Sequence, residues 1–106
     1  MSRKEHDMWQ RLQAIQAQLA QVQQSLEETE VEASAGGAVR VVMTARPRLK
    51  TITISPEAVD PKDVEMLQDM IIAALNDALE KVRALQMEKL LSLAGGLGLS
   101  GLVPEG

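Results

Sequence analysis

The chain of 106 residues contains no cysteine, and its only aromatic residue is Trp9. The absence of cysteine excludes a disulfide framework and a thiolate metal site. Without Phe or Tyr, a core has to be built from aliphatic residues and methionine, which suits helix seams better than a thick globular interior. The length is that of a single domain.

The chain also lacks the usual signs of a membrane span, a secretory signal or an active site. It has no run of about eighteen apolar residues, and its N-terminus is charged and Gln-rich, so we expect a cytoplasmic protein. The only histidine, His6, is interpreted as a solvated residue at a helix start. The acidic cluster at 27–32 lacks a turn glycine at EF-hand spacing, and no catalytic triad, HExxH motif or glycine-rich loop before a helix is present. We therefore expect no enzyme, cofactor, metal or small-molecule substrate.

The N-terminal part of the chain has a heptad pattern. Apolar residues recur at alternating spacings of four and three, through Met8, Leu12, Ile15, Leu19, Val22 and Leu26. The positions between them are mostly Gln, Ala and Glu, which are compatible with a helix. This pattern predicts a helix from Glu5 to Glu28, roughly 36 Å long.

A second long helix is predicted from Pro61 to about Leu93. Asp60 is suited to cap it and Pro61 to begin it. Its apolar face is wider than a two-helix seam requires, so we expect it to contact more than one surface. The residues of this face are Val64, Met66, Leu67, Met70, Ile71, Ala74, Leu75, Ala78, Leu79, Val82 and Leu85.

Between the helices lies a β-rich block, from Gly36 to Asp60. Residues 39–44 and 49–54 alternate with a period of two, which predicts two strands. Arg46-Pro47-Arg48 between them predicts a turn and hence a hairpin. A weaker alternation at 29–35 leaves a third strand open. The predicted fold is α+β: a long helix, an antiparallel sheet of two or three strands and a long helix at residues 1–94, then a flexible Gly-rich tail at 95–106.

A monomer of this kind would expose much of both apolar stripes. Contiguous exposed apolar surface usually marks an interface, and the most common solution is a two-fold homodimer. The sequence therefore predicts self-association.

Charge is unevenly distributed along the chain, although its net value is −4. If the two helices pack antiparallel, basic residues from both ends of the chain meet at the tip of an arm. These residues are Arg3, Lys4, Arg11, Lys81, Arg83 and Lys89, with Arg46 and Arg48 on the hairpin as a second patch. Such clusters bind phosphate backbones, and the simpler reading is solubility and a cation at the helix C-terminus. Trp9 lies near this tip, where it packs on the second helix near Leu85 or Met87, or contacts DNA or a partner protein.

Several short motifs follow one another along the chain. A glycine precedes a V-x-V pair, an I-x-I-[DS]-P run comes later, and an A-x-N-x-A segment lies in the last predicted helix. The residues of these motifs are Gly37, Val39, Val41, Ile52, Ile54, Ser55, Pro56, Ala74, Asn76 and Ala78. Together with the long first helix and the Gly/Pro-rich tail, this order resembles the YbaB/EbfC nucleoid-associated proteins. The family often has an Asn-Gly-like turn where this chain has Ala45-Arg46-Pro47-Arg48.

The resemblance implies a bacterial cytoplasmic homodimer whose strands meet at the centre and whose paired helices project like tweezers around double-stranded DNA. It implies roles in nucleoid organisation, transcription or recombination. The candidate contact residues come from charge and topology, because none falls within the family's motifs. The alternative is a non-catalytic adaptor or chaperone-like dimer that binds proteins through its helix seams.

Overall fold

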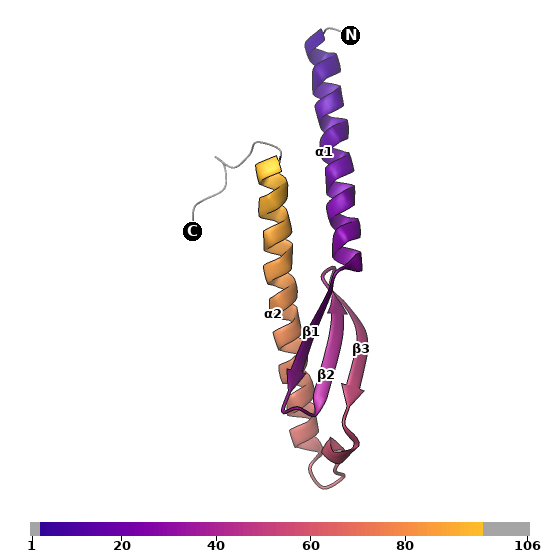
Figure 1. The fold of residues 1–106 in the computed structure, drawn as a ribbon, viewed down its shortest axis with the longest axis vertical. Helices are drawn as coiled ribbons and strands as arrows, with labels where there is room; N and C mark the ends of the chain where they lie inside the picture. Colours follow the sequence, from indigo (N-terminus) through magenta and orange to yellow (C-terminus); the bar gives the residue numbers. More distant parts are fainter. Residues whose placement is uncertain (1–2, 97–106) are drawn as a thin grey trace.

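The structure is a computed structural model that describes residues 3–96. Its elements are α1 (Arg3–Glu28), β1 (Glu30–Ala35), β2 (Val39–Thr44), β3 (Arg48–Ile54), the short 3-10 helix η1 (Pro56–Ala58) and α2 (Val64–Gly96). The molecule is elongated, with α1 projecting from one end of the sheet and α2 running beside both (Figure 1). The predicted α+β order is confirmed. The weak alternation at 29–35 does form a strand, β1.

The core lies between α2 and two of the three strands. The sheet is antiparallel with the order β1-β2-β3, and alternate residues of β1 and β2 point at α2 and are buried. On α2 the buried positions are Ala74, Ala78 and Val82, spaced one helical turn apart. Two alanines in this row allow the helix axis to lie close to the strands. Against them pack Val31, Ala33, Val39, Val41 and Met43.

Strand β3 is left uncovered because α2 packs on β1 and β2. Val41, on the central strand, has 0% of its surface exposed, whereas Ile52, directly opposite it on β3, is 41% exposed. Val41 is therefore buried within one chain, whereas Ile52, on the same face of the sheet, lies beyond the part that α2 covers. Ile52 and Leu49 instead form an apolar strip beside α2.

The two hairpins have different turns. Gly36, Gly37 and Ala38 join β1 to β2. The two glycines have φ values of +59° and +64°, left-handed conformations that glycine adopts without strain. The β2–β3 connection follows the predicted position, with Pro47 between the two strands. Lys50 is an extra residue in β3, because Leu49 pairs with Met43 and Thr51 with Val42.

The predicted start of the second helix is wrong by three residues. The backbone N–H of Met66 donates to the Asp63 carboxylate at 3.2 Å, so Asp63 caps α2. The Asp60 carboxylate instead accepts a hydrogen bond from the N–H of Lys62 at 2.9 Å, within a turn that precedes the helix. At the other end α2 continues through Gly95 to Gly96. The rest of the predicted tail, residues 97–106, lies outside the described part of the chain.

The two long helices overlap over only a short length. Gly96 at the end of α2 lies beside Gln18 and Gln21 of α1, because the first half of α2 runs along the sheet. Residues 3–17 of α1, roughly 22 Å, therefore project alone (Figure 1). Trp9 lies on this projection with 54% of its surface exposed, so within one chain it does not pack near Leu85 or Met87. None of the helices within residues 3–96 is hydrophobic over a length that could span a bilayer.

Candidate nucleic-acid interface

The candidate cations do not gather at one tip. Arg3, Lys4 and Arg11 are exposed on the projecting part of α1. Lys89 lines a shallow hollow of about 250 Å³ between α1 and the end of α2, about two helical turns short of Gly96. Arg83 is exposed on α2. The offset of the helices thus separates the N-terminal cations from those of α2.

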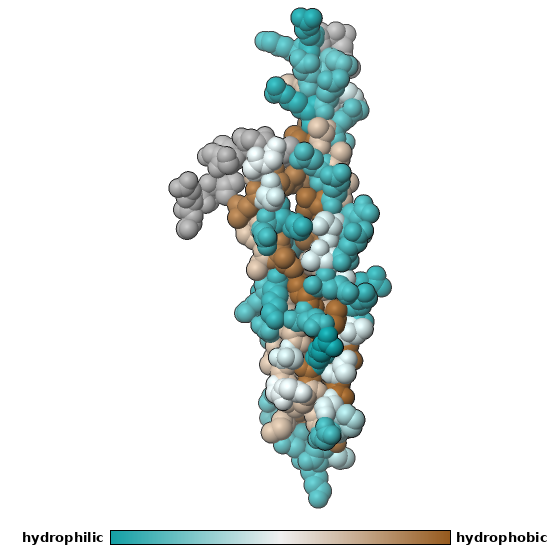
Figure 2. Space-filling view, in the orientation of Figure 1, coloured by the Kyte–Doolittle hydropathy of each residue, from teal (hydrophilic) through white to brown (hydrophobic). Residues whose placement is uncertain are grey.

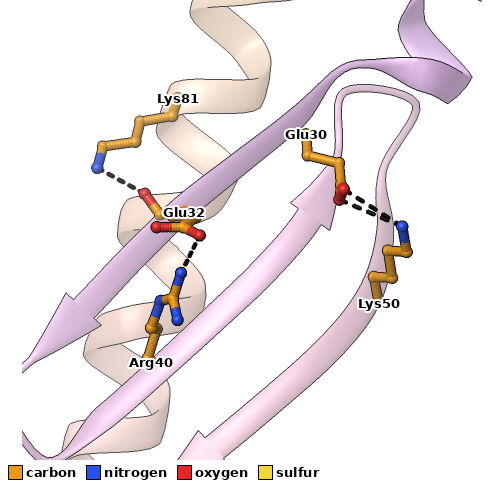
Figure 3. A network of polar contacts seen from close by, with 5 residues as sticks. All are labelled: Glu30, Glu32, Arg40, Lys50 and Lys81. Carbon is orange, nitrogen blue, oxygen red and sulfur yellow. Dashed lines mark hydrogen bonds and ion pairs between the residues drawn. The ribbon is translucent and has the colours of Figure 1, made fainter.

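Lys81 lies at the sheet rather than on the arm. Its ammonium donates to the backbone carbonyl of Glu32 on β1 at 2.8 Å and lies 3.5 Å from the Asp77 carboxylate. Figure 3 shows it reaching from α2 over the outer edge of β1. A lysine in this position blocks the addition of another strand at that edge. The sequence offered no signal for this contact, because the two residues are 49 positions apart.

The second patch is part of a larger set of ion pairs on the sheet face that α2 does not cover. Arg40 pairs with Glu32, and Lys50 donates to both carboxylate oxygens of Glu30 at 3.2 Å (Figure 3). Lys50 reaches across β2 to do so, since Glu30 belongs to β1. The hairpin block is basic in sequence, yet acids from β1 neutralise much of that charge in space.

The hairpin arginines lie where the sheet meets the end of α1. Arg46 forms an ion pair with Glu27 in the last turn of α1. Arg48 has no ion pair within residues 3–96. Both arginines line an open hollow of about 590 Å³ together with Glu27, Thr44 and Pro47. Of the candidate cations on this face, Arg48 is the one left available to an anion.

Hydrogen bonds to its backbone groups fix this hairpin to both helices. The N–H of Arg46 donates to the carbonyl of Leu26 at 3.1 Å, and the N–H of Ala45 donates to the carbonyl of Thr29 at 2.8 Å. The side-chain amide of Gln86 on α2 donates to the carbonyl of Ala45 at 3.0 Å. Ala45 itself is fully buried. The two arginines are therefore carried on a turn that is held in place from three directions.

Residues 3–96 contain no group of three or more His, Cys, Asp or Glu side chains arranged to hold a metal ion. The sheet carries ion pairs between opposite charges, so the charges available to a partner are the unpaired cations. Exposed guanidinium and ammonium groups on α1 and on the hairpin can bind phosphate groups.

Known proteins share the sequence of this chain over most of its length. The profile of the YbaB/EbfC DNA-binding family matches residues 2–97. A nucleoid-associated protein of Acetivibrio thermocellus is 53% identical over 87 residues, covering 81% of this chain and 77% of that protein. One from Chloroflexus aurantiacus is 46% identical over 94 residues, covering 88% and 94%.

A crystal structure shares the fold at low identity. The uncharacterised protein HP0035 of Helicobacter pylori superposes with a TM-score of 0.73 over 88% of this chain and 97% of that one, at 19% identity. The helix–sheet–helix arrangement is therefore a fold already seen experimentally. With the profile match over nearly the whole length, the chain belongs to the YbaB/EbfC DNA-binding family.

Proposed function

We propose that this protein binds double-stranded DNA as a homodimer with weak sequence preference. The choice of DNA as the ligand rests on the family match over residues 2–97, together with relatives named nucleoid-associated proteins. The protein then acts at the nucleoid in the bacterial cytoplasm, in nucleoid organisation, transcription or recombination.

The uncovered apolar surface supports the homodimer. Leu49 and Ile52 are more than 40% exposed on the α2 side of β3, at 45% and 41%. Hydrophobic surface runs along the line where α2 meets α1 and the sheet, while the projecting end of α1 is largely hydrophilic (Figure 2). With Lys81 blocking the β1 edge, β3 is the edge open to a second copy. Other large apolar residues exposed on the helices are Leu12, Leu19, Ile72, Met87, Leu90 and Leu91.

Weak sequence preference follows from the kind of side chain that is exposed. The projecting part of α1 presents Arg3, Lys4 and Arg11 among Gln, Ala and acids. Arginine and lysine on a helix surface contact phosphates, which carry no sequence information. Gln can read adenine edges, yet the glutamines here occupy the solvated positions of a heptad helix. Because the net charge is −4, we expect modest affinity that falls steeply with salt.

The test is duplex binding across a salt series with several unrelated sequences. Replacing Arg3, Lys4 and Arg11 together with Ala should weaken binding to every duplex about equally and flatten the salt slope by up to about 2.7, about 0.9 for each lost phosphate contact. Lys62→Ala, which removes a cation at the opposite end of the molecule, is the control and should bind like the parent. If the parent fails to bind any duplex at low salt, the protein-binding adaptor replaces this proposal.

A further inference from the structure

On the polar face of the sheet, acidic side chains form ion pairs with most of the basic ones. Three of its four basic side chains are paired: Arg40 with Glu32, Arg46 with Glu27 and Lys50 with Glu30. The fourth, Arg48, has no ion pair within residues 3–96. Arg46 and Arg48 line the same hollow, and Glu27 lies in it with them. The unpaired cation thus stands next to a pair that a stronger anion could open.

We propose that this hollow is a phosphodiester site and that Glu27 is its built-in competitor. A backbone phosphate binds between Arg46 and Arg48 and displaces the Glu27 carboxylate from Arg46. This inference deepens the DNA-binding function proposed above and rests on it. Beyond that function, it assigns to the hairpin a phosphate contact that Glu27 covers in the free protein. It also predicts that removing this acid strengthens DNA binding.

The backbone that carries the two arginines does not depend on the ion pair. The hydrogen bonds that anchor the hairpin use the backbone groups of Ala45 and Arg46, with Leu26, Thr29 and Gln86 as partners. Loss of the Glu27 contact therefore frees the guanidinium without releasing the turn. A site whose supporting structure is already in place loses little conformational entropy when its ligand binds.

The position of Glu27 makes its pair with Arg46 easy to exchange. Glu27 lies in the last turn of α1, which contains no basic residue, so its charge faces the negative end of the helix dipole. The side chains of Arg46 and Glu27 are 61% and 51% exposed. Ion pairs this exposed are weak because solvent and salt screen them. A phosphate bound by both arginines gains two charge-assisted contacts in place of one.

Glu27→Gln and Glu28→Gln form a matched pair of variants for the test. Both remove one negative charge from the end of α1, but Glu28 accepts a hydrogen bond from Gln24 rather than from Arg46. Binding of a short duplex of unrelated sequence is measured over a salt series for each variant. Each substitution is repeated in an Arg46→Ala background, and circular dichroism checks that the helices are retained.

We expect Glu27→Gln to tighten binding by up to about fivefold, which corresponds to the upper value of about 1 kcal/mol for an exposed ion pair. Its salt slope should stay close to that of the parent, because the same phosphates are contacted once Glu27 has been displaced. Glu28→Gln should show only the smaller effect of removing a distant charge, and in the Arg46→Ala background the two variants should become equal. Equal effects in the parent background overturn the inference while leaving DNA binding intact. A parent that binds no duplex overturns both.

Discussion

The exposed face of β3 yields the sharpest structural prediction, the effect of Ile52→Asp on the homodimer. In one chain Ile52 is 41% exposed, so the substitution alone should cost folding only about 1 kcal/mol, a fraction of the value of a fully buried side chain. In a dimer that covers this strip, the same Asp places an unpaired charge in an apolar interface. That costs at least about 3 kcal/mol per protomer.

Two-fold symmetry counts the penalty twice, so the dimer should weaken by about 6 kcal/mol, or about 10⁴-fold in its dissociation constant. Light scattering at micromolar concentration should give about 23 kDa for the parent, twice the chain mass of 11.5 kDa, and the monomer mass for Ile52→Asp. Thr53→Asp is the control, since Thr53 lies on the opposite face and across from Arg40. A dimeric Ile52→Asp beside a monomeric Thr53→Asp would refute the assignment, because the interface would then lie on the polar face.

Two further predictions concern the fold within one chain. Val41 is 0% exposed, so Val41→Asp should cost at least about 4 kcal/mol and remove the cooperative thermal transition, whereas Val42→Asp on the polar face should retain that transition. Gly36→Ala should lower the free energy of unfolding by about 1–2 kcal/mol, because a left-handed residue gains a side chain that meets the Met70 sulfur at 2.8 Å. Gly37 has a similar φ and nothing within 4 Å of an added Cβ, so Gly37→Ala should lower the free energy of unfolding by less, as measured by urea unfolding. Equal losses for the two variants would show that the Met70 side chain moves aside at no cost.

Much of the fold could be predicted from local spacing. The heptad seam predicted α1 to within two residues of its start, and the period of two predicted β2 and β3, because these periods are properties of helix and strand geometry. The start of α2 was missed by three residues, since Asp60 and Asp63 are both capable caps. Competition between two nearby caps is decided by the turn that enters the helix.

The candidate site was predicted less well, because its charges are arranged by pairing across the sheet. Arg46 and Arg48 were interpreted as a basic patch, and no acid lies between positions 33 and 56 of the sequence. The register of β1 against β2 brings Glu30 within reach of Lys50, 20 residues away, and the end of α1 brings Glu27 to Arg46, 19 residues away. Contacts over such separations have no periodic signature.

The sequence by itself determined the element types, the apolar stripes and the family of this protein, because each depends on residues close together in the chain or on the order of short motifs. Only the tertiary structure decided how far the helices overlap, which strand is uncovered and which cations are already paired. The first half of α2 packs along β1 and β2. The N-terminal part of α1 therefore projects beyond the end of α2, and β3 stays exposed. These outcomes depend on the lengths of the helices and on the register of the strands, which involve residues far apart in the chain. No local sequence pattern contains that information.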